Sequence, residues 1–322
     1  MPEVKKTINK EFRSKLLAIS LTCLPAWVFT YLALTSFKDY AWGLFVWLPL
    51  IMGVVTTLIL HFTNYQKSIT YNIPLQAMGF FGLGLLFFAM EGLLCIIMVA
   101  PLSLLANFIG FAFTKEIIKK KNTGNSKSFI FILLVSVPLF MSFESMVGKK
   151  EKLRSVTTTI TIDAAPEVVW ENVIAFPELN EPTELIFKTG IAYPISATIQ
   201  GEGVGSTRYC NFSTGHFVEP ITIWDEAKLL QFDVINQPEP MKEISPYNIH
   251  PNHLNGYWVS KKGQFKLTIK NGKTILEGTT WYINKIKPDF YWTIWSDHIV
   301  HKIHQRVLKH IKHESEKKNK NT

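Results

Sequence analysis

The sequence predicts two parts: an all-α transmembrane bundle of four or five helices, followed by an α+β domain. Residues 1–154 hold 16 of the 34 Lys and Arg but only 7 of the 25 Asp and Glu, whereas residues 155–322 hold 18 of each. The first part contains uncharged stretches of about 20 residues, the length that crosses the hydrocarbon of a bilayer. The second part alternates Thr, aromatic and aliphatic residues between turn dipeptides, as strands do.

The net charge of +9 therefore belongs entirely to the first part. Its basic residues flank apolar segments, as they do in helices anchored at a membrane face, and the second part has no basic cluster. We therefore do not expect nucleic acid as a partner. The three cysteines, Cys23, Cys95 and Cys210, are widely spaced and give neither a disulfide framework nor zinc-ligand spacing. Neither a metal nor a cofactor is expected.

Five apolar segments are the candidate membrane spans: 16–37, 41–63, 73–90, 93–113 and 128–147. The first is too long for the apolar core of a signal peptide and lacks a small-residue cleavage site. The polar turn Lys38-Asp39-Tyr40 separates it from the second. The apolar stretch 73–113 is about twice as long as one span needs. It predicts a helical hairpin that turns at Glu91-Gly92, or else one tilted helix kinked near Pro101.

The distribution of Lys and Arg predicts the topology of these segments. Five spans place 11 basic residues on the N-terminal side of the membrane and 5 on the other, and four spans place 10 and 6. Both counts put the N-terminus in the cytoplasm of a bacterial inner membrane, because cytoplasmic segments carry the basic excess. We favour five spans, which place the second part in the periplasm.

Glu91 is the only charged residue between Lys67 and Lys115. With Cys95 and Met98 it has the spacing i, i+4, i+7, which places the three side chains on one helix face. A carboxylate, a thiolate and a thioether can hold a soft metal ion such as Cu(I), and an ionisable residue inside a membrane is a functional candidate. The alternative is that Cys95 and Met98 are packing residues and that Glu91 marks a turn in water.

The second part reads as one strand, two short helices, six strands and a long helix. The first strand is 155–163, the first helix begins at Pro166 and stops before Pro177, and 178–187 is the second helix. The remaining strands are 191–200, 204–213, 216–225, 229–236, 257–270 and 273–284. The closing helix covers about 289–314, and its apolar stripe is Trp295, Ile299, Ile303, Val307 and Ile311.

Asn271-Gly272 predicts a type I′ turn, which fixes the pairing of the last two strands. Opposed residues share a face, so the inner face carries Phe265, Leu267, Leu276, Thr280 and Tyr282. On 204–213 the more apolar face carries Arg208, Cys210 and Phe212. A buried arginine needs a partner. A ligand carboxylate or phosphate and a carboxylate of the core both serve, and a surface position for Arg208 is the third possibility.

Four short motifs follow one another in this part: Ala165-Pro-Glu-Val-Val-Trp170, Gly201-x-Gly-x-Gly-x-x-Arg208, Gly215-x-Phe217 and Gly263-x-Phe265. In their order and spacing they resemble the motifs of the START-like helix-grip (SRPBCC) superfamily, and of its polyketide cyclase/dehydrase-type members above all. The resemblance covers residues 155–316 and leaves 317–322 as a polar tail. It implies an antiparallel sheet wrapped around the long C-terminal helix, with a hydrophobic cavity between them. Members bind or transform lipids, sterols and polyketides, and they share no universal catalytic residue.

We therefore expect an integral membrane protein whose helix-grip domain binds a membrane lipid or another hydrophobic small molecule. The candidate ligand-binding residues are Arg208, Cys210, His216, Phe265, Thr280, Tyr282 and Trp295. The first alternative is an enzyme of cyclase, dehydratase or hydrolase type that uses His216, Tyr282 or Arg208 for proton transfer. The second is a membrane sensor or assembly factor.

Three further motifs favour structural interpretations. Residues 201–205 resemble a phosphate-binding loop, but they join two strands, so a hairpin turn is expected. His298, His301 and His304 are expected on a solvated helix flank, although Asp297 or Glu219 could complete a zinc site. The loop 237–256, with His250 and His253, is either a lid over the cavity or a plain connection.

Overall fold

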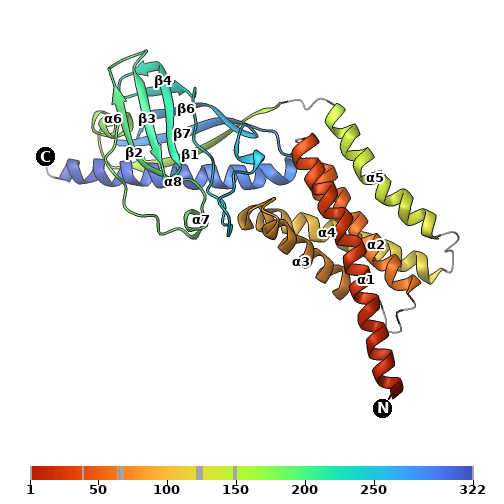
Figure 1. Cartoon of the computed structure of the whole chain (residues 1–322). Coiled ribbons are helices and arrows are strands. Elements are labelled where there is room, and N and C mark those ends of the chain that lie inside the picture. The colour runs from red at the N-terminus through yellow and green to blue at the C-terminus, as the bar shows by residue number, and fades with distance from the viewer. Residues whose placement is uncertain are drawn as a thin grey trace. The chain divides into compact units, whose positions relative to one another are not determined.

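The protein is described from a computed structural model, which covers residues 2–37, 40–63, 65, 69–120, 126–147 and 151–320. Side chains are described within these ranges except at residues 2–9, 37, 126–129 and 319–320. The chain forms two compact units (Figure 1). The helical unit consists of Met1–Lys149 and Glu243–Asn252, and the sheet unit consists of Lys150–Lys242 and His253–Thr322. The predicted turn at Lys38 and Asp39 lies outside the described residues.

Within the described residues, the helical unit contains five α-helices at the positions of the five predicted segments. They are α1 (Pro2–Leu32), α2 (Leu48–Phe62), α3 (Asn72–Phe87), α4 (Leu93–Lys119) and α5 (Ser126–Met146). Short π-helical turns extend α1 through Ala33–Phe37 and precede α2 at Gly43–Trp47. Residues 88–92 form a turn between α3 and α4, so the hairpin is present and Pro101 lies inside α4.

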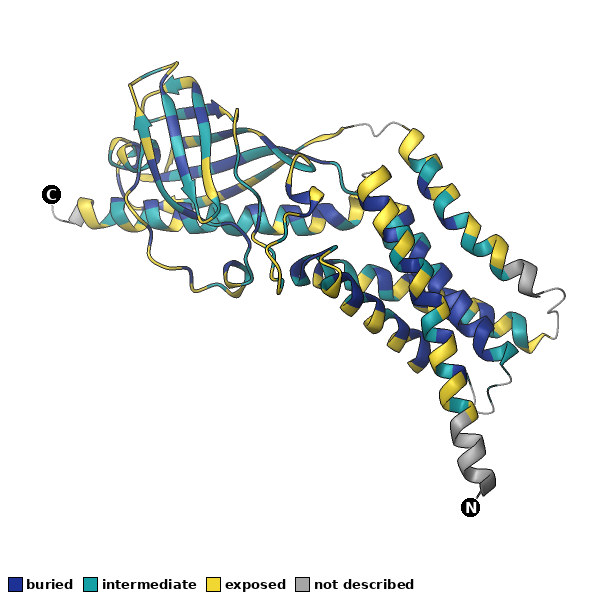
Figure 2. Cartoon of the chain, viewed as in Figure 1, coloured by how far each residue is buried: buried dark blue, intermediate teal, exposed yellow. Residues whose placement is uncertain are grey.

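Three helices are long and apolar enough to cross a membrane: Lys10–Ser36, Gly43–Phe62 and Leu93–Lys119. The apolar helices Asn72–Phe87 and Ile130–Met146 are shorter. Large apolar side chains are exposed on the surface of this unit: Leu83, Phe87 and Phe113 are each more than 60% exposed. Figure 2 shows in yellow the exposed positions along its helices. Exposed apolar patches of this kind are rare on soluble proteins.

Close contact between α2 and α4 depends on glycine and on polar side chains. A Cβ atom at Gly53 would lie 2.2 Å from the Asn107 carbonyl oxygen, and one at Gly110 would lie 2.2 Å from that of Leu50. Small residues let helix backbones approach in this way. Pro49 cannot donate to the carbonyl of Phe45, four residues earlier. Ser103 Oγ of α4 donates to that oxygen instead, at 3.1 Å. A neighbouring helix thus satisfies the carbonyl that proline frees at this position.

Glu144, near the end of α5, binds the beginning of the segment that leads into α2. Its two carboxylate oxygens accept hydrogen bonds from the backbone N–H groups of Trp42 (3.0 Å) and Gly43 (2.9 Å). The first N–H groups of a helix have no partner within it and carry partial positive charge. A carboxylate from a neighbouring helix therefore satisfies them, which explains an acidic residue in an otherwise apolar helix.

The segment Glu243–Asn252, which follows the fifth strand in the sequence, belongs to the helical unit. The Ile244 carbonyl accepts from the backbone N–H of Leu93, at 2.9 Å, and Asn252 Nδ2 donates to the Leu34 carbonyl, also at 2.9 Å. The predicted boundary near residue 154 placed this segment in the second part, whereas the structure assigns it to the helical unit. Half of the loop 237–256 is thus a packed part of the helical unit and not a plain connection.

The sheet unit contains seven strands in one antiparallel sheet of order β1-β7-β6-β5-β4-β3-β2 (Figure 1). The strands are β1 (Leu153–Ile162), β2 (Pro194–Gln200), β3 (Thr207–Phe212), β4 (Gly215–Asp225), β5 (Leu229–Asp233), β6 (Trp258–Lys270) and β7 (Lys273–Asn284). Asn271 and Gly272 have φ of 53° and 75°, as a type I′ turn requires. The predicted pairs Leu267 with Leu276 and Phe265 with Gly278 are present.

Three helices accompany the sheet: α6 (Pro166–Ile174), α7 (Leu185–Lys188) and α8 (Asp289–Lys320). The second short helix was predicted over 178–187, but only Leu185–Lys188 is helical. Arg306 of α8 donates to the Pro194 carbonyl of β2, and Lys312 donates to the Thr161 carbonyl of β1. The strands β1 and β2 are the two edges of the sheet, so the sheet curls around α8 and the unit has the helix-grip arrangement.

Candidate functional site

Strand register defines the face of the sheet that is turned toward α8. Directly opposed residues share a face, and successive pairings carry this relation from β2 to β1. The inner face contains Arg208, Cys210 and Phe212 of β3, and Phe217, Glu219 and Ile221 of β4. It continues with Leu230, Phe232, Gly263, Phe265, Leu267, Leu276, Gly278, Thr280, Tyr282, Arg154, Val156, Thr158, Ile160 and Ile162.

One region of this face is a closed apolar core. Leu230, Leu276 and Ile162 are fully buried, and Val169 and Trp170 of α6 belong to the same cluster. The α8 residues of this core are Val307, Leu308 and Ile311. The first three members of the predicted stripe on α8, Trp295, Ile299 and Ile303, are only partly buried. Only the C-terminal half of α8 thus contributes to this cluster, although Trp292 and Val300 of the N-terminal half are also buried.

Arg208 lies in the interior as predicted, and its partner is a carboxylate of the core. Its guanidinium NH1 donates to Glu219 Oε2, and its Nε donates to the Ile174 carbonyl at 3.2 Å. The register places Arg208 directly opposite Glu219. Arg208 is 2% exposed and Glu219 5%. Burial raises the pKa of the Glu219 carboxyl, and the neighbouring guanidinium opposes that rise.

Three aromatic rings surround this ion pair. The guanidinium carbon of Arg208 lies 5.6 Å from the ring centre of Phe176, 5.4 Å from that of Phe232 and 5.7 Å from that of Phe265. Such contacts stabilise a cation that has lost its water. Cys210 is buried beside the pair, and its burial raises the pKa of the thiol to about 12. At neutral pH this cysteine is a packing thiol and not a nucleophile.

Polar side chains replace the apolar core where the N-terminal half of α8 meets β1 and β7. Thr158 Oγ1 lies 2.7 Å from His301 Nδ1 and 3.1 Å from His304 Nδ1. Thr280 Oγ1 lies 2.8 Å from His304 Nε2, and Gln305 Nε2 lies 2.8 Å from His301 Nε2. We call these five side chains the histidine–threonine chain.

The protonation of His304 follows from this environment. Burial, followed by the proximity of His301, lowers the pKa of His304 to about 4. The ring is therefore neutral at physiological pH. The expectation that these histidines line a solvated helix flank is wrong for His301 and His304, because both bind threonine hydroxyls of the sheet; it holds for His298, which is exposed.

Tyr282 lies two residues beyond Thr280 on the inner face. Its hydroxyl donates to Asp297 Oδ1 of α8, and Asp297 Oδ2 lies 3.5 Å from an Arg154 guanidinium nitrogen. Trp258 stacks on the Tyr282 ring with centres 5.4 Å apart. Burial and the hydrogen bond to Asp297 raise the pKa of the Tyr282 hydroxyl. Tyr282 therefore holds its proton firmly.

The structure places the other predicted ligand-binding residues unequally. Phe265 and Thr280 lie on the inner face and keep part of their surface accessible, as do Phe212 and Phe217. Trp295 is partly buried on α8. His216 precedes Phe217 of the inner face in β4, but its own side chain is exposed. Its ring centre lies 6.1 Å from that of Tyr209. The structure thus brings Arg208, Cys210 and Phe265 together but does not bring His216 to them.

Sequence analysis did not single out Thr158 or Gln305, and it assigned no interior role to His304. The sequence offers one signal for this contact: helical spacing in one segment and strand alternation in another place polar side chains on the sides that face each other. His301 and His304 are three residues apart on a helix, and Thr158 sits at an inward position of an alternating strand. Without the pairing of helix and strand, nothing in the sequence connects them.

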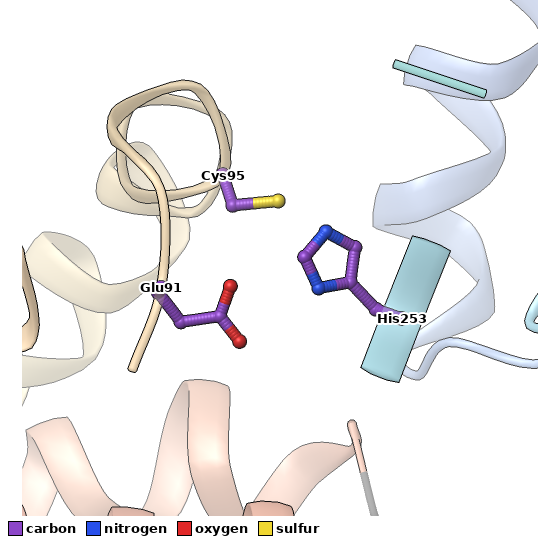
Figure 3. A group of neighbouring side chains, drawn as sticks. All are labelled: Glu91, Cys95 and His253. Atoms are coloured by element: carbon purple, nitrogen blue, oxygen red, sulfur yellow. The ribbon is translucent and has the colours of Figure 1, made fainter. Parts of the chain in front are cut away.

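The three intramembrane candidates lie at the beginning of α4. Glu91 and Met98 are 8% and 5% exposed, and Cys95 is partly buried. Glu91 precedes the helix by two residues, so the predicted single helix face does not extend to it. Figure 3 nevertheless shows the Glu91 carboxylate and the Cys95 thiol directed to the same side. His253, also labelled there, belongs to the sheet unit, where it is buried in the short helix Asn252–Leu254.

The glycines at 201–205 form the connection between β2 and β3, which pair with each other. Gly201, Gly203 and Gly205 have φ of 89°, 79° and 91°, values that glycine adopts without strain. The predicted hairpin turn is therefore confirmed. A phosphate loop would lead into a helix.

Comparison with known proteins gives neighbours in structure only. No protein-family model matches the chain, and no curated protein matches it. A solved structure of the Zhui aromatase/cyclase from Streptomyces is 14% identical, with a TM-score of 0.33, over 51% of this chain and 94% of that one. Norcoclaurine synthase from Thalictrum flavum is 12% identical, with a TM-score of 0.31, over 51% and 96%. An uncharacterised protein from Bacillus thuringiensis is 15% identical, with a TM-score of 0.33, over 50% and 97%.

Proposed function

We propose that this is an integral membrane protein whose sheet unit binds a lipid or another hydrophobic small molecule between the sheet and α8. The observation that supports binding is the partial accessibility of inner-face side chains. Phe212, Phe217 and Phe265 lie on the concave side of the sheet yet are not fully buried, whereas Leu230 and Leu276 of the same face are. The three rings pack against the core cluster and still leave part of their surface accessible. An apolar ligand would cover them.

The family resemblance of residues 155–316 supports the same function, because helix-grip proteins of that superfamily bind hydrophobic molecules. The exposed apolar surface of the helical unit supports membrane insertion, and a ligand drawn from the bilayer would not need to cross water. Enzymatic proton transfer has weaker support. His216 is exposed, the Tyr282 hydroxyl donates a hydrogen bond to Asp297, and Arg208 is paired with Glu219. No observation specifically favours the role of a membrane sensor or assembly factor.

Photocrosslinking tests the binding site. The full chain in liposomes is incubated with a fatty acid that carries a diazirine in its alkyl chain, irradiated and digested. We expect labelled peptides from 207–225 and 273–284, in addition to labelling of the transmembrane helices. Phe217→Trp fills the inner face and should reduce labelling of these peptides several-fold. Val218→Trp, on the opposite face of the same strand, is the control. Absence of label from the sheet unit, or equal labelling in both variants, refutes the proposal.

Cysteine accessibility tests the proposed five-span topology, in which the N-terminus is cytoplasmic and the sheet unit periplasmic. Cys210 is 6% exposed and cannot report on it. Glu202 is exposed in the β2–β3 turn, so Glu202→Cys is a suitable site. We expect a membrane-impermeant maleimide to label this variant in spheroplasts. Labelling only after lysis of the inner membrane rejects five spans.

A further inference from the structure

The hydrogen bonds of the histidine–threonine chain all donate in one direction, from Gln305 through the two histidines to Thr280. Gln305 Nε2 is an amide nitrogen and can only donate, so His301 Nε2 accepts and carries no proton. The proton of His301 is therefore on Nδ1, and it points at Thr158 Oγ1 at 2.7 Å. A histidinium could not accept from Gln305, so the same contact requires a neutral ring.

The direction continues through the second histidine. Thr158 Oγ1 accepts from His301 and uses its own proton to donate to His304 Nδ1, 3.1 Å away. His304 is neutral, so its proton is on Nε2, which donates to Thr280 Oγ1 at 2.8 Å. Each of the two histidines is fixed in one tautomer by its other hydrogen bond. The two tautomers are opposite, with Nδ1–H in His301 and Nε2–H in His304.

Thr280 is the end of this chain, and its hydroxyl proton is left to donate elsewhere. Within the part of the chain that the structure describes, His304 is the one side chain shown to hydrogen-bond this hydroxyl. Thr280 lies on the inner face, where it keeps part of its surface accessible. Gly263, directly opposite Thr280 on β6, has no side chain, and the Phe232 ring lies over it, where a Cβ atom of residue 263 would be 2.4 Å away. Donors in series polarise one another, so the Thr280 proton is a stronger donor than that of an isolated hydroxyl.

We propose that the histidine–threonine chain presents Thr280 as a hydrogen-bond donor to a carbonyl or carboxylate oxygen of the bound molecule. The proposal rests on the proposed function, because the molecule lies between sheet and α8. It narrows the ligand class to hydrophobic molecules with an oxygen acceptor, such as fatty acids, esters or ketones. A molecule whose polar end is an ammonium group can use only the second lone pair of Thr280 Oγ1, and it leaves the Thr280 proton without an acceptor.

Solid-state NMR of the full chain in liposomes, with ¹⁵N-labelled histidine, tests the direction of the chain without any ligand. His301→Asn and His304→Asn assign the signals. We expect a proton on Nδ1 of His301 and on Nε2 of His304. Gln305→Glu offers the opposite partner, since a carboxylate accepts from His301 Nε2–H. This variant should reverse both tautomers and turn the Thr280 proton back toward His304. The same tautomer in both rings of the unmodified protein, or no change in Gln305→Glu, overturns the proposed direction.

Two photoprobes test the ligand class: a diazirine fatty acid and the alkane of the same chain length with the same diazirine. In the unmodified protein the fatty acid should label the sheet unit at least tenfold more than the alkane does. Thr280→Val and Gln305→Glu should remove this preference while leaving alkane labelling in place, and Thr280→Ser should restore it. Equal labelling by the two probes in the unmodified protein overturns the role of Thr280 alone. Absence of label from both probes overturns the proposed function and, with it, the ligand.

Discussion

Substitutions at Arg208 and Glu219 should show that this ion pair is a unit of the core. Both side chains are almost fully buried, and Glu219 is the carboxylate that compensates the guanidinium. Removing one member of such a pair typically costs about 3–5 kcal/mol, because the other charge stays buried without compensation. We therefore expect Glu219→Gln to destabilise the sheet unit by about that amount.

Replacing both members of the pair by methionine should destabilise the sheet unit much less than the sum of the costs of Arg208→Met and Glu219→Met alone. In Arg208→Met/Glu219→Met, no charge remains, and the methionine occupies the space among Phe176, Phe232 and Phe265. The main remaining loss is the hydrogen bond from Arg208 Nε to the Ile174 carbonyl, worth about 1–3 kcal/mol when the acceptor is left buried. The double-mutant cycle should thus give a coupling of several kcal/mol.

Hydrogen exchange of the full chain, read by mass spectrometry on peptides from β3 and β4 across a urea series, measures these free energies of opening for the sheet unit alone. Refuting results are additive single and double costs, or a cost below about 1 kcal/mol for Glu219→Gln. Either would mean that Arg208 is not held by Glu219 in solution and is available to anchor an acidic ligand.

Three further predictions concern single positions. Folding lowers the pKa of His304 from 6.5 to about 4, so between these pH values the unfolded chain binds more protons than the folded chain. The free energy of unfolding should therefore drop by at most about 3 kcal/mol as pH falls through this window. In urea titrations, His304→Asn should remove this pH dependence of stability. Ser103→Ala leaves the Phe45 carbonyl without this donor and should lower the melting temperature in detergent, at a cost of about 1–3 kcal/mol, whereas Ser142→Ala should not. Gly272→Ala forces a side chain onto a φ of 75° and should cost about 1–2 kcal/mol by hydrogen exchange in β6 and β7; no measurable cost would contradict the turn type.

The sequence predicted best where a local rule determines the structure. Asn271-Gly272 specified the turn, and the turn specified the register of β6 and β7 with its inner face. Helix hydropathy likewise located the five helices, with two larger differences at their ends: α1 begins at Pro2 instead of residue 16, and α4 extends to Lys119 instead of residue 113. The burial of Arg208 was predicted from the apolar residues at alternate positions of its strand. Its pairing with Glu219 depends on the register between β3 and β4, and no sequence motif indicates that register.

Prediction failed where the structure depends on contacts between distant segments. The residues 178–184 lack a helix although their composition permits one. Segment 243–252 contains two prolines and a histidine, which are typical of loops. Nothing local indicates that it contacts Leu93 and Leu34, which lie 151 and 218 residues before their partners in the sequence. The histidine–threonine chain is the same kind of case, because its members come from β1, β7 and α8 and acquire meaning only when these elements meet.

Docking of segment 243–252 can be tested through Gly92, because an added Cβ atom there would overlap with Glu243. A Cβ atom at Gly92 would lie 2.1 Å from Glu243 Oε2 and 2.6 Å from Glu243 Cβ, so an alanine there must displace the segment. Gly92 has a φ of −89°, which alanine adopts readily, and the substitution therefore acts through this contact and not through backbone strain. Gly79→Ala in α3, where nothing lies within 4 Å, is the matched control.

We expect the peptide that covers 243–252 to exchange its amide hydrogens at least tenfold faster in Gly92→Ala than in Gly79→Ala, in the full chain in detergent. The reason is that the hydrogen bond from Leu93 to Ile244 and the bond from Asn252 to Leu34 are both lost when the segment moves away. Equal exchange in the two variants would show that the segment is not held at α4. If the segment is held there, a fragment that begins at residue 155 lacks its packing partners and exposes it to proteolysis, so ligand binding must be measured on the whole chain.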